Sequence, residues 1–314
     1  MSVKVSIIIP FLNEEEGMPS LLEALNQYIK SLIDFKVEVI FVNDGSTDNS
    51  MKVLKQSMPL QFEAKVISLS KNFGSHAALR SGILNASGDY IVFMYADLQD
   101  PLEIIGSLYH KCKEGCDIAW AMRRNTNNSF IEQKFSMFYA AMMKKYAMAN
   151  YPQKGFDVVM FDKKVQFNLN ANMEANSSIF LQILQLGYKQ ETIEYDKQVR
   201  KIGKSKWTLK KKIKLFIDSF VAFSYAPIRF VTIMGFAFFF IGICWTAYVI
   251  FRKFFVGDIA SGWPALISIL FLGFGVTNIS LGIIAEYLWR TLDASRKRPV
   301  FIIDEITELN KHDK

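Results

Sequence analysis

The sequence predicts an α/β domain followed by a helical region in a membrane, and three observations support this prediction. In residues 1–207, short apolar runs alternate with segments of helical periodicity, a pattern typical of a mostly parallel sheet with helices on both faces. Residues 208–226 form a basic amphipathic segment, and residues 227–290 are mostly apolar with few charges. The polar residues 291–314 follow as a tail.

Five strands are expected in residues 1–207, each a short apolar run bounded by turn residues. They cover Val3–Ile9, Val37–Val42, Lys65–Leu69, Tyr90–Tyr95 and Asp117–Met122. Pro10 ends the first strand, because proline cannot donate into a sheet. In parallel sheets, ligands bind beyond the carboxyl ends of the strands. Asn13, Asp44 and Asp97 all follow predicted strand ends, so we expect three polar clusters to share one edge.

The segment 208–226 predicts an amphipathic helix. Leu209, Ile213, Phe216, Ile217 and Phe220 share one helical face, whereas Lys210, Lys211, Lys212, Lys214 and Asp218 occupy the other. A basic helix of this kind suits a membrane interface. A helix packed on the α/β domain is the alternative.

Two apolar stretches, Phe230–Phe251 and Trp263–Trp289, are each long enough to span a hydrocarbon core of ~30 Å. More basic residues lie outside this pair than in its linker, so both ends are expected on the cytoplasmic side. Two buried core helices are the alternative, but a domain of this size has little room for both. We therefore expect an integral membrane protein with a cytoplasmic domain and tail. Residues 298–303 of the tail suit an edge strand.

The charge pattern also favours a membrane. A net charge of +7 suits nucleic acid or anionic lipid. The basic residues concentrate between Arg200 and Lys214, directly before the apolar region, where anionic headgroups attract each by about 1 kcal/mol. No nucleic acid partner is therefore expected. Cys112, Cys116 and Cys244 form no zinc pattern and suit free thiols in a reducing compartment. The N-terminal apolar run is too short for a signal peptide.

Two of the polar clusters suit recognition of a planar base. Pro10–Glu14 can present donors and acceptors, although Asn-Glu after a strand is also a common helix cap. In Asn43–Asp48, Asp44 can accept from a base N–H, and Ser46 or Thr47 can cap the next helix. An ordinary capped turn is the alternative for this second cluster.

The third cluster, Asp97-Leu98-Gln99-Asp100, predicts a metal site. Asp97 and Gln99 stand two residues apart after a strand, so both side chains can face one ion. Oxygen ligands of this kind suit a hard divalent cation, which neutralises a diphosphate leaving group. A loop acid without a metal is the alternative.

Together these clusters resemble motifs of the inverting family 2 glycosyltransferases. Within that family they are most similar to the polyprenyl-phosphate glycosyltransferases, which include dolichol-phosphate mannose synthases and bactoprenol glucosyltransferases. The matching segments are Ile-Ile-Pro-Phe-Leu-Asn-Glu, Val-Asn-Asp-Gly-Ser-Thr-Asp, Ser-Lys-Asn-Phe-Gly, Ala-Asp-Leu-Gln-Asp-Pro and Gly-Lys-Ser-Lys-Trp. They occur in the family's order, and the resemblance covers nearly the whole chain.

The resemblance implies a GT-A fold and a nucleotide-sugar donor, which is UDP-linked in most members. The residues implied in donor binding are Pro10, Asn13, Glu14, Asp44 and Asp97. Asp97 and Gln99 are implied to hold Mg²⁺ or Mn²⁺. Tyr95 stands where the family often has an Asp, which leaves the identity and affinity of the metal open.

The resemblance also implies a polyprenyl phosphate acceptor, undecaprenyl phosphate in a bacterium. Its phosphate must be held against repulsion from the donor diphosphate, which calls for cationic side chains. The residues expected to hold it are Arg123, Arg200, Lys204, Ser205 and Lys206. Asp157, with Asp97 the second catalytic candidate, matches a family position near the acceptor. Because a phosphate is already ionised at neutral pH, Asp157 is expected to orient groups rather than take a proton. A structural acid is the alternative.

Other classes of protein fit less well. A transporter would leave the polar clusters unexplained, and an inactive nucleotide-binding scaffold has only Tyr95 in its favour. A processive polysaccharide synthase would carry more membrane spans and a Gln-x-x-Arg-Trp motif, which this sequence lacks. A protein acceptor fits less well than a lipid because of the Gly-Lys-Ser-Lys-Trp segment. The sugar stays open, as does the subunit number, although the relatives commonly form homo-oligomers through their membrane helices.

Overall fold

In a computed structural model of the chain, the described residues are 3–57, 60, 62–124, 130–146, 148, 151–152, 158–174, 177–198, 226–255, 262–296 and 298–309. They belong to two compact units. The first combines Met1–Ser219 with Pro299–Lys314, and the second is Phe220–Arg298. The second unit therefore lies, along the chain, between the two parts of the first unit.

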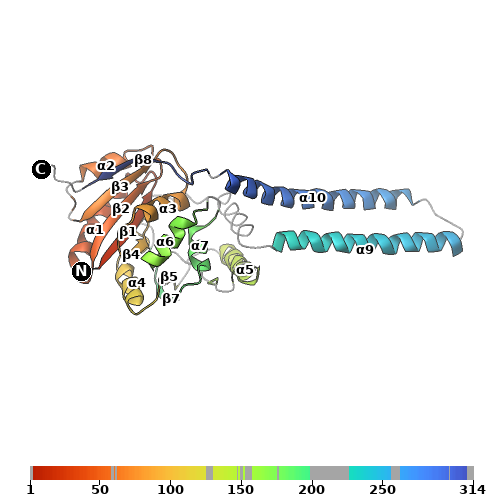
Figure 1. The fold of residues 1–314 in the computed structure, drawn as a ribbon, viewed down its shortest axis with the longest axis horizontal. Helices are drawn as coiled ribbons and strands as arrows, with labels where there is room; N and C mark the ends of the chain where they lie inside the picture. Colours follow the sequence, from red (N-terminus) through yellow and green to blue (C-terminus); the bar gives the residue numbers. More distant parts are fainter. Residues whose placement is uncertain are drawn as a thin grey trace. The chain divides into compact units, whose positions relative to one another are not determined.

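The first unit is built on an eight-stranded sheet of order β7-β5-β6-β4-β1-β2-β3-β8 (Figure 1). The strands are β1 Lys4–Phe11, β2 Lys36–Asn43, β3 Glu63–Leu69, β4 Tyr90–Phe93, β5 Ile118–Arg123, β6 Val158–Asp162, β7 Gln190–Tyr195 and β8 Ile303–Glu308. Strands β4, β1, β2 and β3 are parallel neighbours, whereas β6 and β8 pair antiparallel with the strands beside them. The expected α/β class and mostly parallel sheet are confirmed, as are the five expected strands.

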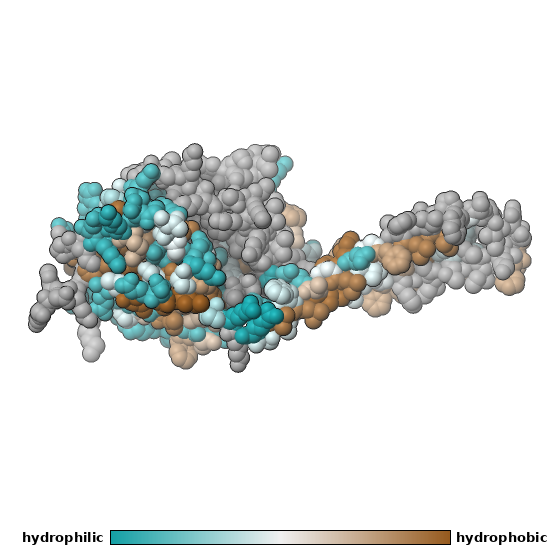
Figure 2. Space-filling view, turned by 90° about the horizontal axis from the view of Figure 1, so that it is seen from above, coloured by the Kyte–Doolittle hydropathy of each residue, from teal (hydrophilic) through white to brown (hydrophobic). Residues whose placement is uncertain are grey.

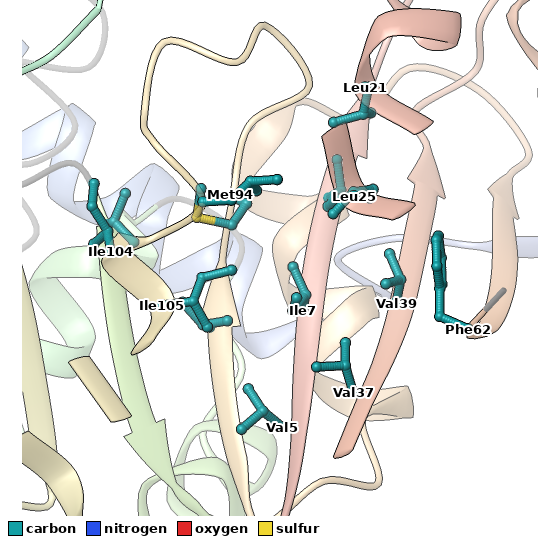
Figure 3. Close-up of a cluster of buried hydrophobic side chains, with 14 of the residues drawn as sticks. Val5, Ile7, Leu21, Leu25, Val37, Val39, Phe62, Met94, Ile104 and Ile105 are labelled. Atoms are coloured by element: carbon teal, nitrogen blue, oxygen red, sulfur yellow. The ribbon is translucent and has the colours of Figure 1, made fainter. Parts of the chain in front are cut away.

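Helices cover both faces of this sheet (Figure 1). They are α1 Met18–Ser31, α2 Ser50–Gln56, α3 Ser75–Asn85, α4 Ile104–Lys113, α5 Phe130–Tyr146, α6 Lys163–Ala171 and α7 Ile179–Gln185. On one face, Ile7 and Val39 of the strands pack with Leu25 of α1 and Ile105 of α4 in a buried apolar cluster (Figure 3).

The other face of the sheet packs against α3, α6 and α7. Gly82 of α3 lies so close to β1 that a Cβ at this position would be 2.3 Å from Ile8 Cγ2. The ring of Phe180 on α7 meets Phe93 of β4 edge to face, with centroids 5.8 Å apart. Both faces are therefore dry, which explains why the parallel strands read as continuous apolar runs.

The C-terminal tail returns to the first unit as strand β8. It pairs antiparallel with β3, from Lys65 opposite Glu308 to Leu69 opposite Ile303. A tail strand at the sheet edge is confirmed, but its expected bounds were wrong: β8 shares only Ile303 with the expected residues 298–303 and continues to Glu308.

The second unit consists of two long helices, α9 Ala226–Phe255 and α10 Trp263–Ser295, which contact each other. Both apolar stretches expected from the sequence are thus helical. Apolar side chains lie exposed along both helices, among them Phe236, Phe240, Trp245, Phe274 and Leu288. Figure 2 shows hydrophobic residues in brown along this helical unit. In the part of the chain that the structure describes, no helix meets the combined length and apolar content required of a membrane span. Residues 208–225 of the expected amphipathic helix lie outside the described residues.

Glu38 of β2, only 3% exposed, ties strands and turns together near the amino ends of β1 and β2. It accepts hydrogen bonds from Ser6 Oγ and, at 2.6 Å, from the Ser87 backbone N–H, and Lys4 Nζ lies 3.1 Å away. A Cβ at Gly88 would lie 2.6 Å from Ser6 Oγ, so this turn requires glycine. Burial by itself would raise the pKa of Glu38, but the bonds from Ser6 and Ser87 outweigh it and lower the pKa to about 2.

We expect Glu38→Gln to lower the free energy of unfolding by about 2 kcal/mol at pH 7, because the amide loses charge-assisted hydrogen bonds in a buried site. A carboxyl group with a lowered pKa stabilises the fold above its unfolded pKa of 4.5 and loses this effect as the pH falls toward 2. Urea unfolding should therefore show the wild-type advantage shrinking over this pH range. Glu63→Gln is the matched control, since Glu63 binds the same Lys4 from an exposed position. A stability difference between the wild type and Glu38→Gln that does not change with pH would contradict the lowered pKa of Glu38.

Candidate active site

Four loops meet at one edge of the sheet. Because β4, β1, β2 and β3 are parallel neighbours, all four strands end at the same edge, where ligands bind in sheets of this type. The loops that follow them carry Asp97, Asn13, Asp44 and Ser70, respectively. The predicted convergence of three polar clusters is confirmed, and the Ser70–Gly74 loop joins them as a fourth.

The loops after β1 and β2 hold each other. The Asn13 backbone N–H donates to Ser46 Oγ at 3.0 Å, and the Thr47 N–H donates to Asn13 Oδ1 at 2.8 Å. The Glu14 N–H donates to Ser50 Oγ at 2.8 Å. Asn13 therefore serves as a bridge between two loops rather than as a helix cap, since the N-cap of α1 is Gly17.

The expectation that Ser46 or Thr47 caps α2 was wrong. The N-cap of α2 is Asn49, and Asp48 instead accepts from the backbone N–H and the hydroxyl of Ser50. Burial works to raise the pKa of Asp48, but these bonds from Ser50 and the amide of Glu15 outweigh it and lower the pKa. Asp48 is thus an ionised carboxylate that fixes the turn.

Asp44 is the central acceptor for the loop after β3. Its carboxylate is buried and accepts from the Phe73 N–H at 2.7 Å and the Gly74 N–H at 3.0 Å. Gly45 makes room for this contact, because a Cβ there would lie 2.6 Å from the Asn72 backbone nitrogen. In this structure Asp44 organises a backbone loop, and its contact with a nucleotide base stays a prediction.

Two residues of the candidate site adopt a strained backbone. Asn13 has φ 51° and Leu98 has φ 52°, and they are the non-glycine residues with positive φ in the described ranges. For a residue such as leucine, this conformation costs about 1–2 kcal/mol. Strain of this kind concentrates at functional sites, where surrounding contacts impose the geometry. Both residues stand in loops that the sequence assigned to ligand binding.

The predicted metal loop is a tight turn after β4. Asp97 Oδ1 accepts from the Gln99 backbone N–H at 3.2 Å, and the side chains of both residues are only partly buried. Asp100 differs from them, because its side chain is buried and faces Tyr195 Oη at 2.5 Å and Lys197 Nζ at 3.3 Å. Asp97 and Gln99 are therefore the residues of this loop that suit an external ligand, while Asp100 is committed to the protein.

The segment after β7 binds the predicted metal loop. Besides the contacts of Asp100 with Tyr195 and Lys197, the Gln198 backbone N–H donates to the Gln99 carbonyl at 2.9 Å. The sequence patterns predict no role for Asp100, Tyr195 or Lys197. Local pattern could not reveal them, because Tyr195 lies 95 residues from Asp100 along the chain.

Of the remaining predicted site residues, the structure describes Arg123 and Pro10. Arg123 is the last residue of β5, which runs parallel to the neighbouring β7. The next residue, Arg124, also contacts β7, because its N–H donates to the Tyr195 carbonyl at 2.8 Å. Pro10 lies within β1 opposite Val42 of β2, so the expectation that it ends the strand was wrong, since β1 continues to Phe11. Asp157, Arg200, Lys204, Ser205 and Lys206 lie outside the described residues.

Comparison with known proteins agrees with the motifs. Residues 6–166 match the family described as Glycosyl transferase family 2. The chain is 31% identical over 305 residues to the Bacillus subtilis protein named uncharacterized glycosyltransferase YkcC, with 96% of this chain and 94% of the relative covered.

Two further relatives carry more specific names. An undecaprenyl-phosphate 4-deoxy-4-formamido-L-arabinose transferase of Proteus mirabilis is 31% identical over 317 residues, with 99% of this chain and 96% of the relative covered. The bactoprenol glucosyl transferase of Shigella phage SfV is 30% identical over 306 residues, with 96% of this chain and 98% of the relative covered. The chain therefore belongs to glycosyl transferase family 2, as its motifs implied, and is a glycosyltransferase.

Proposed function

We propose that this glycosyltransferase moves a sugar from a UDP-sugar to undecaprenyl phosphate, with inversion at the anomeric carbon. An oxygen of the lipid phosphate attacks the anomeric carbon in line, its bond to that carbon forms, and the bond to the diphosphate breaks as UDP departs. The names of two full-length relatives, which refer to undecaprenyl phosphate and to bactoprenol, support a polyprenyl phosphate acceptor.

The observation that carries this proposal is the contact between the predicted metal loop and Gln198, which lies just before the predicted acceptor segment in the sequence. The Gln198 N–H bonds the Gln99 carbonyl, and Arg200 follows two residues later. We propose that the cationic segment that follows Gln198 in the sequence holds the acceptor phosphate beside this loop. An anionic acceptor held there would meet the donor at its diphosphate end.

The linked loops after β1, β2 and β3 support a preformed donor site. Their backbone amides are bound by side chains of neighbouring loops, as in the bonds of Asn13 with Thr47 and of Asp44 with Gly74. A site organised before binding loses less conformational entropy when the ligand arrives. We propose that the nucleotide lies over these loops, with Pro10, Asn13, Glu14 and Asp44 around its base.

The donor atoms of the metal loop suit Mg²⁺ or Mn²⁺. Within the described residues, no group of three or more His, Cys, Asp or Glu side chains is arranged to hold a metal. The proposed site instead has one carboxylate, Asp97, and one amide oxygen, Gln99, both hard oxygen ligands. Mg²⁺ is commonly bound by one or two carboxylates together with substrate phosphates, so the donor diphosphate would complete this site. When bound, the ion would neutralise charge that develops on the leaving diphosphate.

The protein's own residues would position the two anions. Arg123, Arg200, Lys204, Ser205 and Lys206 would hold the acceptor phosphate by charge-assisted hydrogen bonds. Since that phosphate is ionised at neutral pH, no general base is required for the attack. Asp157 would orient the acceptor rather than accept a proton.

We propose that α9 and α10 attach the enzyme to the bacterial inner membrane, with the catalytic unit on the cytoplasmic side. The apolar side chains exposed along both helices support this part of the proposal, because a soluble monomer rarely leaves so large an apolar surface uncovered. A polyprenyl tail would then remain in the lipid while its phosphate reaches the protein.

Replacing the proposed metal ligand tests the chemistry. We expect Asp97→Ala to reduce sugar transfer by at least roughly 100-fold, because charge on the leaving diphosphate would no longer be neutralised. The assay measures transfer of label from a panel of UDP-sugars to undecaprenyl phosphate in detergent extract, with and without EDTA. Asp34→Ala, at an exposed position, is the matched control and should keep wild-type activity. Full activity of Asp97→Ala would end the metal assignment.

Replacing Asp100 tests the link between the metal loop and the acceptor segment. We expect Asp100→Asn to lower kcat/KM for undecaprenyl phosphate by roughly 10- to 100-fold, because small displacements of reacting groups cost this much. The variant keeps the shape of the side chain but loses the charge that faces Lys197.

Asp196→Asn is the matched control for Asp100→Asn. It makes the same substitution in the segment that Asp100 contacts, at an exposed residue paired with Arg124 at 3.1 Å, where an ion pair contributes little. Equal activity of the two variants would contradict the proposed link.

A further inference from the structure

The C-terminal strand contacts the loop that Asp44 organises. The Ser70 backbone N–H donates to the Ile302 carbonyl at 3.0 Å. Ser70 is the first residue after β3 and begins the loop that ends at Gly74. This bond therefore joins the tail, which comes after the two long helices in the chain, to a loop of the proposed donor site.

A bulge in β8 produces this contact. Glu305 pairs with Ser68, but the next pair is Ile303 with Leu69, so Asp304 is an extra residue on the tail strand. A bulge bends its strand and turns the following backbone in a new direction. Here the extra residue Asp304 shifts the register by one residue, so that the Ile302 carbonyl, rather than that of Ile303, accepts from Ser70.

The loop between Ser70 and Gly74 is held at both ends. At the far end, the N–H groups of Phe73 and Gly74 donate to the Asp44 carboxylate. In the middle, the backbone of Asn72 packs against Gly45. At the near end, Ile302 fixes Ser70, whose own side chain is exposed. Movement of Ser70 would consequently shift the Phe73 and Gly74 amides that donate to the Asp44 carboxylate.

We propose that β8 is a positioning element for the nucleotide sugar: by holding Ser70, it fixes the loop that binds Asp44 and shapes the donor site. This inference rests on the proposed function in taking Asp44 as part of that site. It concerns the donor and not the acceptor, since Gln198, which precedes the predicted acceptor segment in the sequence, contacts the Asp97 loop.

The anchor of β8 offers a way to release the strand from a distance. Leu309, at the end of the tail strand farthest from Ile302, is 3% exposed within the apolar core, and its N–H donates to the Ala64 carbonyl at 2.9 Å. Ile306 lies on the same strand but is 47% exposed. Truncation of Leu309 should loosen β8, whereas the same truncation of Ile306 should not.

The test compares Leu309→Ala with Ile306→Ala in the full-length protein. We expect amide hydrogen exchange at Phe73 and Gly74 to become about two- to tenfold faster in Leu309→Ala, the effect of losing a typical hydrogen bond. KM for the UDP-sugar should rise by a similar factor, while kcat stays within about twofold. Exchange in β5 should not change, which separates positioning from a general loss of stability. Ile306→Ala should match the wild type in all three measurements.

Glu305→Pro provides a second route if Leu309→Ala does not fold. It leaves the core untouched but introduces a residue that cannot donate in the ladder, and the same changes at Phe73 and Gly74 are expected. Unchanged exchange at these amides in a variant whose β8 amides have lost protection would overturn the proposal. So would faster exchange with an unchanged KM. Because exchange needs no substrate, this result stands apart from a failure of the wild-type protein to transfer sugar, which would refute the proposed function instead.

Discussion

The parallel pairing of β4, β1, β2 and β3 is the constraint on which the rest of the site depends. Because these strands run side by side in one direction, their four following loops emerge at the same edge. The loops then form hydrogen bonds with one another: the Thr47 N–H donates to Asn13, and the Gly74 N–H donates to Asp44. Each loop lacks regular structure of its own, so its backbone amides find partners in the neighbouring loop. The edge consequently behaves as one surface built from segments far apart in the sequence.

The fold class and the first five strands followed from the sequence because both faces of the parallel sheet are dry. A strand covered on two sides reads as an unbroken apolar run, as in β1 and β2. Strand β7 has no such run, since Gln190–Tyr195 lies at a sheet edge with half of its residues exposed to solvent. The first four residues of β6, Val158–Phe161, are apolar and buried, but a run this short does not distinguish a strand from a buried helical turn.

The candidate site was predictable only where its signal is local. Asp97 and Gln99 stand close together in one turn, so their spacing pointed to a shared ligand. The partners of Asp100 could not be found in this way, because Tyr195 and Lys197 come from the end of β7 and the segment after it, whose position depends on the order of the whole sheet. The same reason explains the wrong assignment of Ser46 and Thr47. Their hydroxyl and amide groups bind Asn13 of an adjacent loop, and adjacency of strands is a tertiary property.

The position of β8 also constrains how the chain is assembled. The catalytic unit consists of Met1–Ser219 and Pro299–Lys314, so the two long helices are inserted between β7 and the strand that completes the sheet. Closing a loop of this length adds little free energy over closing a shorter one, because the entropy cost grows only with the logarithm of loop length. The insertion is therefore compatible with a stable sheet. Its consequence is one of order: Ser70 gains its partner Ile302 only after α9 and α10 have been synthesised, so the loop that binds Asp44 is completed last.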